Sequence, residues 1–327
     1  MQIRTGILTR IAALAALAAV VAAPHARAES YPDHPIKMIV SFPAGGGADV
    51  LVRILAKHMD EDLGQTIVVE NKPGAGGAIA YGLAARAAAD GYTLVWTTAG
   101  YPVMAATVPG LTFDPDKAFV HICDVAENPF VLVVNPKVPA TSVKELIALA
   151  KAKPDTLNFA NNGVGTLTNL TVELLKLKAG IHVAQIPYRG DNFSSADVMA
   201  GNADAMFSNS PVALPHIHAG QLRGLAVTSP KRSPAAPDIP TMQEAGVPDF
   251  SVVIWQGFSA PVGTPRPVID RLNASARKAL QAPEVIERFQ ALGAERIGSS
   301  PEEFQKLVGQ EMTRWADVVK QSGVKVQ

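Results

Sequence analysis

One turn in this chain of 327 residues is built almost entirely from glycine, alanine and proline. In order, the turn contains Phe42, Pro43, Ala44, Gly45, Gly46, Gly47, Ala48 and Asp49. An apolar run beginning at Ile36 precedes it, and apolar residues at helical spacing follow it. A strand–turn–helix unit leaves unpaired N–H groups at the positive end of the helix dipole. Because glycine has no side chain to block an approaching anion, the turn predicts a carboxylate site.

A purely structural explanation is that the chain only reverses tightly here, as it does in many α/β proteins. Gly45, Gly46 and Gly47 do not have the G-x-G-x-x-G spacing of a dinucleotide site, and no Gly-Lys-Ser/Thr follows as in a P-loop. We therefore predict neither a nucleotide nor any other cofactor.

The turn needs neighbouring strands to form a site. Strands are expected at Gln65–Glu70 and Tyr92–Thr97, separated by a helix from Ala78 to about Ala88, which indicates parallel βαβ units. In a 2-1-3 strand order, ligands bind beyond the carboxyl ends of the first and third strands. This order places Ala99, Gly100 and Tyr101 beside the turn. The loop Asn71–Gly77 lies one strand further out, so we expect it to be structural.

A second α/β series follows with the same pattern. Its strands are expected at Leu157–Ala160, Val183–Tyr188 and Ala203–Phe207, and the same rule predicts site residues where these strands end. Those residues are Asn161, Gly163, Gly165, Thr166, Ser208 and Asn209. Two such halves, crossed twice by the chain, predict two lobes that close around a cleft. The expected lobes are residues 29–130 with 252–327, and residues 131–251.

The first 28 residues have the pattern of a cleavable signal peptide. A basic start and an apolar stretch lead to Ala26-Arg27-Ala28, so we expect the mature, exported chain to begin at Glu29. Cleavage removes three of the 29 basic residues and leaves 26 against 29 acidic ones, a net charge of −3. This balance argues against nucleic acid as a partner. The single cysteine, Cys123, excludes an intrachain disulfide and is expected to be a buried, inert thiol.

A set of short motifs carries a resemblance along the whole mature chain. The motifs are Tyr31-Pro32-x-x-Pro35-Ile36, the turn itself, Val69-Glu70-Asn71-Lys72-Pro73-Gly74-Ala75-Gly76-Gly77, Asp90-Gly91-Tyr92-Thr93-Leu94, Pro187-Tyr188-Arg189-Gly190, Leu225-Ala226-Val227-Thr228 and Ala260-Pro261-x-Gly263-Thr264-Pro265. In this order they resemble the Bug family, the extracytoplasmic solute receptors of tripartite tricarboxylate transporters.

The resemblance implies a type II periplasmic-binding-protein fold, with two doubly wound α/β lobes around a central cleft. It implies a small carboxylate ligand: a dicarboxylic or tricarboxylic acid, an acidic amino acid, or a nicotinate-like or aromatic acid. The turn would hold one carboxylate through backbone amides and ordered water, while Gly163–Thr166, Tyr188 and Arg189 would close over the ligand. The implied partners are the membrane subunits of the transporter, and we expect a periplasmic monomer.

Two positions near the expected pocket depart from the family pattern. Asn169 stands where members usually carry histidine, and Ser208 where they usually carry aspartate, so the ligand cannot be copied from a relative.

Several single residues allow two interpretations. Asp49 could bind a ligand ammonium group, but aspartate is strongly preferred as a helix cap, which we favour. Arg189 could pair with a second carboxylate or lie exposed. Tyr101 and Tyr188 could hydrogen-bond the ligand or cover the cleft.

An exported hydrolase is the alternative from another class, and a sensing role for the loaded receptor is a third. The hydrolase is disfavoured because there is no G-x-S-x-G motif and no histidine in a pocket turn. His216 and His218 do not share a helix face, so no metal site is predicted.

Overall fold

The computed structural model describes residues 31–45 and 47–324. The predicted signal peptide, residues 1–28, and the expected mature start at Glu29 lie outside the described residues. The chain from His34 onward forms one unit, distinct from the short segment before it. None of the helices in the described ranges is long and apolar enough to cross a membrane.

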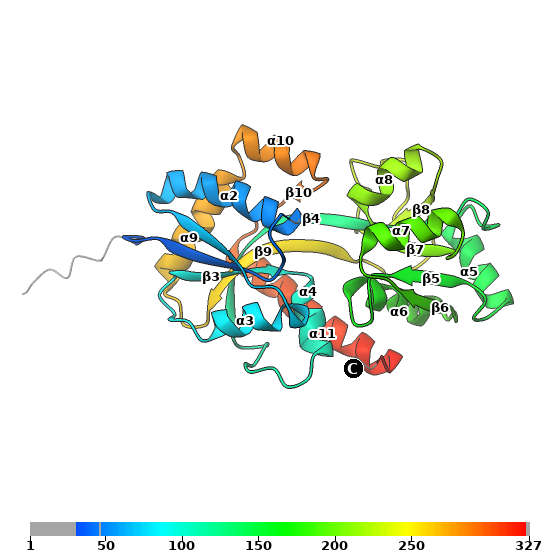
Figure 1. The fold of residues 1–327 in the computed structure, drawn as a ribbon, viewed down its shortest axis with the longest axis horizontal. Coiled ribbons are helices and arrows are strands. Elements are labelled where there is room, and N and C mark those ends of the chain that lie inside the picture. Colours follow the sequence, from blue (N-terminus) through cyan, green and yellow to red (C-terminus); the bar gives the residue numbers. More distant parts are fainter. Residues whose placement is uncertain (1–30, 46, 325–327) are drawn as a thin grey trace, which may run out of the picture. The chain divides into compact units, whose positions relative to one another are not determined.

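The unit begins with a βαβ series, as the sequence pattern predicted (Figure 1). Its elements are β1 (Ile36–Val40), α2 (Gly47–Leu63), β2 (Ile67–Asn71), the 3-10 helix η1 (Ala75–Gly77), α3 (Ala78–Ala85), β3 (Thr93–Thr98) and α4 (Gly100–Thr107). Strand β1 pairs in parallel with β2 on one side and β3 on the other, so the expected 2-1-3 order is confirmed. The turn after β1 and the start of α4 therefore leave the sheet at the same edge.

A second series repeats this arrangement. Its elements are α5 (Val143–Ala152), β5 (Asn158–Asn161), α6 (Leu167–Ala179), β6 (Ala184–Pro187), α7 (Asp191–Ala200), β7 (Ala205–Asn209), α8 (Ser210–His218) and β8 (Arg223–Val227). Strand β5 pairs in parallel with both β6 and β7, which again gives a 2-1-3 order. The turn before α6 and the ends of β6 and β7 therefore share one edge.

Two long antiparallel strands connect the series: β4 (Phe119–Val134) and β9 (Val253–Pro261). The first part of β4 pairs with β9, whereas Phe130–Val134 pairs with β7 and β8. The strand order is β2-β1-β3-β9-β4-β7-β5-β6, so β4 belongs to both groups (Figure 1). The apolar run Phe130–Val134 reads as a strand and lies in β4, but the strand begins eleven residues earlier than the sequence indicates, at Phe119. Asp124, Asn128 and Pro129 are uncommon in strands, and two irregularities in register accommodate this first part beside β9.

The chain ends with α9 (Arg266–Ala279), α10 (Pro283–Ala291), β10 (Glu295–Arg296) and α11 (Pro301–Ser322). The sequence Ser300-Pro301-Glu302-Glu303 indicates a capped helix start, and the structure confirms it: Ser300 and Glu303 form a capping box. The apolar face of α11 joins two hydrophobic clusters, because Phe304 packs with the first series and Trp315 with the second. Both side chains are fully buried. This one helix therefore ties the two series together.

Two helix starts differ from what the sequence indicates, and three helices were not predicted. Thr264-Pro265 reads as a capped helix start, but Thr264 donates its hydroxyl to the Pro261 carbonyl and Pro265 is the N-cap residue of α9. The sequence indicates a helix from about Ser194, and α7 begins three residues earlier, at Asp191. Helices α4, α8 and α10 were not predicted; each has a proline in its first turn, where proline is tolerated: Pro102, Pro211 and Pro283.

Candidate functional site

A network of hydrogen-bonded polar side chains fixes the conformation of the glycine-rich turn. The backbone N–H of Gly45 donates to Asp49 Oδ2 at 2.9 Å, and Gly45 itself has a φ of +80°, which favours glycine. Arg53 Nε donates to Asp49 at 3.0 Å, and Asn71 Nδ2 donates to Asp49 Oδ1 at 2.8 Å and to the Phe42 carbonyl at 3.0 Å. Residues from α2 and the end of β2 therefore fix the shape of the turn.

Asp49 is part of this network rather than part of a cavity wall. Its side chain is only 3% exposed, and helix α2 begins two residues earlier, at Gly47, so Asp49 lies in the first turn and is not the N-cap we expected. Burial alone would raise the pKa of the Asp49 carboxyl, but hydrogen bonds from Arg53, Gly45 and Asn71 lower it to about 2. Asp49 is thus ionised and fully engaged within the protein.

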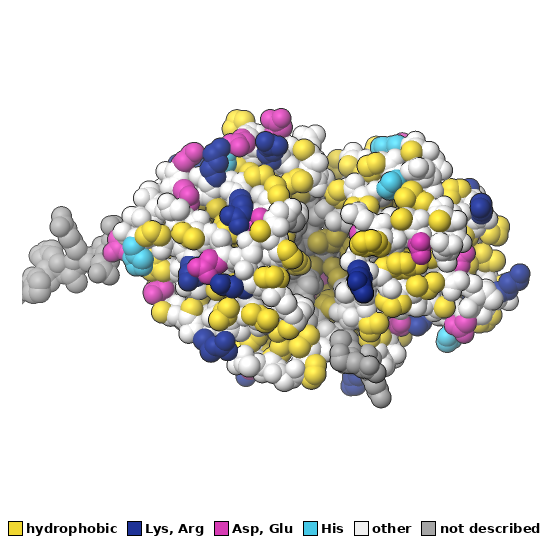
Figure 2. All heavy atoms as spheres, viewed as in Figure 1, with side chains coloured by type: hydrophobic (Ala, Val, Ile, Leu, Met, Phe, Trp, Pro, Cys, Tyr) yellow, Lys and Arg dark blue, Asp and Glu magenta, His cyan; other side chains and the backbone are white. Residues whose placement is uncertain are grey.

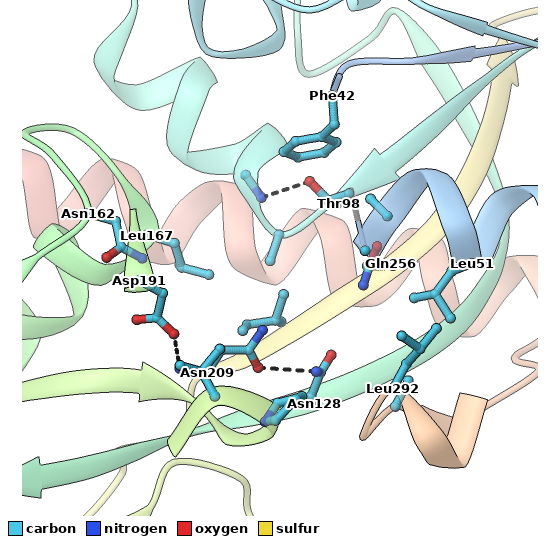
Figure 3. A pocket seen from close by; sticks show the side chains of 18 of the residues that line it. Phe42, Leu51, Thr98, Asn128, Asn162, Leu167, Asp191, Asn209, Gln256 and Leu292 are labelled. Carbon is cyan, nitrogen blue, oxygen red and sulfur yellow. Dashed lines mark hydrogen bonds between the residues drawn. The ribbon is translucent and has the colours of Figure 1, made fainter. Parts of the chain in front are cut away.

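In front of the turn lies a cavity of about 840 Å³ between the first and second series. Figure 2 shows the molecule hollowed there, with hydrophobic side chains around the hollow. Most of the wall is apolar; its larger members are Phe42, Leu51, Phe130, Leu167, Val212, Ile254 and Leu292. They come from the β1–α2 turn, α2, β4, α6, α8, β9 and the segment after α10, so elements from both series close around the same space (Figure 3).

Ten of the residues predicted from sequence line this cavity. They are Phe42, Pro43, Ala44, Gly45, Gly47, Ala48, Ala99, Gly100, Thr166 and Asn209. Gly46 lies outside the described residues. The order of the parallel strands thus brings together the β1–α2 turn, the start of α4, the cap of α6 and the end of β7.

The other predicted residues lie behind the wall or outside it. Tyr101 is fully buried and donates its hydroxyl to the Pro115 carbonyl at 2.6 Å; burial raises its pKa. The Asn161 side chain donates to Gln185, and the Ser208 hydroxyl donates to Asp191.

Three predicted residues that follow β5 and β6 also lie outside the wall of this cavity. Tyr188 donates its hydroxyl to Asp197 at 2.7 Å, and burial raises the pKa of Tyr188 to about 12. Arg189 is exposed, and neither it nor Gly163 is part of this wall.

A second cavity, of about 670 Å³, adjoins the first and shares six wall residues with it, among them Phe42, Thr98 and Thr166. Gly165 and the loop Pro73–Gly77 line this second cavity. Part of the loop Asn71–Gly77, which we expected to be structural, therefore lines this cavity, while its first residue, Asn71, donates hydrogen bonds to the first turn.

The sequence analysis did not find four polar residues of the inner wall: Asn128, Thr168, Asp191 and Gln256. Asp191 stands at the start of α7, and its Oδ2 accepts hydrogen bonds from the Asn209 backbone N–H at 2.9 Å and the Ser208 hydroxyl at 3.1 Å. Burial raises the pKa of Asp191 to about 6, although the Asn209, Ser208 and Asn162 donors oppose this rise. Its position directly after Arg189-Gly190 was a signal that could have found it.

Gln256 and Asn128 were harder to find, because they lie in the middle of the long strands β9 and β4. The Trp96 indole donates to Gln256 Oε1 at 3.3 Å, and Asn128 Nδ2 donates to Asn209 Oδ1 at 3.1 Å (Figure 3).

The charge of the first cavity is unusual for a site expected to bind an anion. No lysine, arginine or histidine is among its described wall residues, and Asp191 is the ionisable side chain there. Among the described residues there is also no cluster of three or more histidine, cysteine, aspartate or glutamate side chains able to hold a metal. Cys123 is buried and is not part of the wall, and burial raises its pKa to about 12, as expected for an inert thiol.

Comparison with known proteins gives a consistent result. The family model described as "Tripartite tricarboxylate transporter family receptor" matches residues 51–324. BugT of Bordetella pertussis is 39% identical over 309 residues, which cover 94% of this chain and 94% of BugT.

Two solved structures extend the comparison. The periplasmic binding protein BugD is 37% identical, with 91% of this chain and 100% of BugD covered and a TM-score of 0.73. An R. palustris protein solved with adipate is 32% identical, with 90% of this chain and 99% of that protein covered and a TM-score of 0.75. These relatives are substrate-binding receptors and not enzymes. The chain therefore has the two-lobed α/β fold of periplasmic binding proteins and belongs to the family of tripartite tricarboxylate transporter receptors.

Proposed function

We propose that this protein is a periplasmic receptor that captures a small carboxylate and delivers it to the membrane subunits of a tripartite tricarboxylate transporter. Its family membership and the adipate bound to a relative support the ligand class and the transport role. The signal-peptide pattern of residues 1–28 supports export. The lobes would be residues 29–130 with 252–327, and residues 131–251; the change of β4 partners at Phe130 and the start of β9 at Val253 support this division.

The observation that carries the proposal is that the N-terminus of α2 forms part of the cavity wall through small residues. Gly47 and Ala48, the first residues of this 17-residue helix, both line the cavity. Their backbone N–H groups belong to the first helical turn, which has no intrahelical acceptors, and the helix dipole favours an anion there. Because the described wall residues include no cationic side chain, this end of α2 is the strongest attraction for a carboxylate.

Under this proposal, the ligand contacts would come from both halves of the cleft. The proposed ligand-binding residues are those of the predicted set that lie on the wall, namely the β1–α2 turn, Ala99, Gly100, Thr166 and Asn209. Gly165 and the second cavity would admit a longer ligand.

The first test is thermal melting of residues 29–327 with a panel of carboxylic acids: C4 to C6 dicarboxylates, citrate, acidic amino acids and benzene carboxylates. A ligand at 100 times its dissociation constant adds about 2.7 kcal/mol to the free energy of unfolding, which shifts the midpoint measurably. Refolding from denaturant before the assay removes any ligand trapped during purification. Failure of every acid to shift the midpoint of the refolded protein would count against a carboxylate receptor.

The second test places a side chain in front of the helix end. Gly47 has ordinary φ, and a Cβ there meets no atom within 4 Å, so Gly47→Leu leaves the fold unstrained while covering the proposed anion site. We expect at least a tenfold loss of affinity, which is about 1.4 kcal/mol. Gly309→Leu is the matched control, because this exposed glycine of α11 also has free space and lies away from the cavity. Equal affinities for the two variants would refute the proposed anion site.

A further inference from the structure

The polar groups that face the first cavity from β9 and β7 are neutral amides with free donors. Gln256 Oε1 accepts the hydrogen bond from Trp96 Nε1. An indole N–H can only donate, so this contact fixes the carbonyl end of the Gln256 amide toward Trp96 and leaves its NH₂ group toward the cavity (Figure 3). The NH₂ group has no hydrogen-bond partner within the described part of the chain. The Gln256 amide is therefore fixed in orientation with its NH₂ group available to donate, and the residue is only 9% exposed.

Asn209 provides a second neutral donor. Its Oδ1 accepts from Asn128 Nδ2, and its backbone N–H is engaged with Asp191. The side-chain NH₂ of Asn209 is therefore the group that can donate to a ligand, and Figure 3 shows it directed into the cavity. Donors on Gln256 and Asn209 can serve any ligand oxygen with a lone pair.

The charge of the neighbouring wall decides which oxygen fits. Asp191 contributes a carboxylate to this wall, and no cationic side chain among the described wall residues offsets it. Its Oδ2 accepts two hydrogen bonds, which oppose the effect of burial; burial still raises the pKa of Asp191 to about 6, so the group is mostly ionised at pH 7. A second anionic group of a ligand would lose its water, meet only neutral donors and lie in the same cavity as a like charge. Each of these effects disfavours a dianion.

The space between the α2 end and the two amides is apolar. Leu51, Leu167 and Leu292 project into it in Figure 3, and Phe130 and Ile254 complete this part of the wall. A hydrocarbon or aromatic body would bury apolar surface there at about 25 cal/mol per Å². A ligand dominated by charged groups would gain nothing from this surface.

We propose that the ligand is an acid with a single ionised carboxylate, an apolar body and a neutral hydrogen-bond acceptor at the far end. The carboxylate binds at the N-terminus of α2, the far oxygen accepts hydrogen bonds from Gln256 and Asn209, and Asp191 discriminates against a second carboxylate. This assignment rests on the proposed carboxylate-receptor function and narrows its ligand class.

The test compares each diacid with its own monoamide, which has the same number of heavy atoms but one charge less. Calorimetric titration of the refolded protein with succinate and succinamate, glutarate and glutaramate, and adipate and adipamate covers three lengths. We expect at least one monoamide to bind about tenfold or more tightly than its diacid. If diacids bind as tightly as their monoamides, the inference is overturned while the receptor function stands. If no carboxylate binds at all, the proposed function fails and the inference fails with it.

Two variants assign the discrimination to residues. Asp191→Asn keeps an acceptor for Ser208 and Asn209 but removes the charge, so it should raise diacid affinity and reduce the monoamide preference several-fold. Asp197→Asn on the same helix is the control, because Asp197 binds Tyr188 away from the cavity and should leave the preference unchanged. Gln256→Leu should weaken the monoamide and leave hexanoate, which lacks the far acceptor, unaffected. An unchanged preference in Asp191→Asn, or equal losses for both ligands in Gln256→Leu, would refute these roles.

Discussion

Replacing Asp49 with asparagine tests whether the network behind the glycine-rich turn stabilises the fold by charge. The carboxylate receives hydrogen bonds from Arg53, Asn71 and the Gly45 backbone, and its pKa falls from the usual 3.8 to about 2. Because the folded pKa lies below the unfolded one, this stabilisation is present above pH 3.8 and is lost as the pH falls through the folded pKa. Asparagine has nearly the same shape but cannot carry the charge.

The magnitude follows from the difference between the folded and unfolded pKa. Each pH unit of that difference corresponds to about 1.4 kcal/mol, so the charged carboxylate contributes about 2.5 kcal/mol at pH 7. Nearly all of this remains at pH 5, and roughly half remains at pH 3. Asp49 is buried, but the side chain of its partner Arg53 is 49% exposed, so solvent screening makes these values upper estimates. With an unfolding entropy of about 2.1 cal/mol/K per residue, the loss at pH 7 corresponds to a fall of about 4 °C in Tm.

The assay is urea unfolding of the wild-type and Asp49→Asn proteins at pH 7, 5 and 3. Asp60→Asn is a control on the same helix: the Asp60 carboxyl also accepts a backbone hydrogen bond, from Ile67, but burial raises its pKa. That substitution should become more favourable, not less, as the pH rises. A loss for Asp49→Asn that is equal at pH 7 and pH 3 would refute the electrostatic reasoning and leave only shape as the cause.

Two further predictions concern the long strands. Burial lowers the pKa of His121 to about 3, so the unfolded chain takes up a proton below pH 6.5 while the folded protein does not. The variant His121→Gln should therefore lose about 2 kcal/mol less stability than the wild type between pH 7 and pH 5 in urea unfolding. An unchanged pH dependence would contradict this prediction. At Gly257 in β9, an added Cβ would lie 2.1 Å from the Cys123 carbonyl and 2.8 Å from Phe304. Gly257→Ala should therefore lower the free energy of unfolding by more than about 3 kcal/mol. A decrease below about 1 kcal/mol would show that β4 and β9 can move apart.

The agreement between sequence and structure is best where local rules apply. The alternation of apolar runs with amphipathic segments predicted both βαβ series, and the capping pattern at Ser300 marked the start of α11. Strand order and the positions of ten wall residues then followed from general rules about parallel sheets. These features depend on residues that are close together in the chain, and for that reason the sequence alone predicts them.

The failures occurred where distant segments override local preference. The first part of β4 contains Asp124 and Asn128 and does not read as a strand, but pairing with β9 and packing beneath α11 cover it. Helices α4, α8 and α10 were not predicted; each carries a proline in its first turn, a position that accepts proline readily. Tyr101 follows β3 at the correct edge, yet its side chain points inward to Pro115, a direction that no spacing rule contains.

The sequence by itself determined the α/β class, the two repeated series, the glycine-rich turn at the end of β1 and the family to which the chain belongs. Only the tertiary structure decided what faces the cavity. In the folded protein, Asp49 hydrogen-bonds within the network behind the turn. Gln256 and Asn128, in the middle of two long strands, lie on the inner wall, and Asp191 is the charged group among the described wall residues. The physical reason is that exposure and hydrogen-bond partners depend on contacts between residues far apart in the chain, whereas a local pattern shows only where each strand or helix begins and ends.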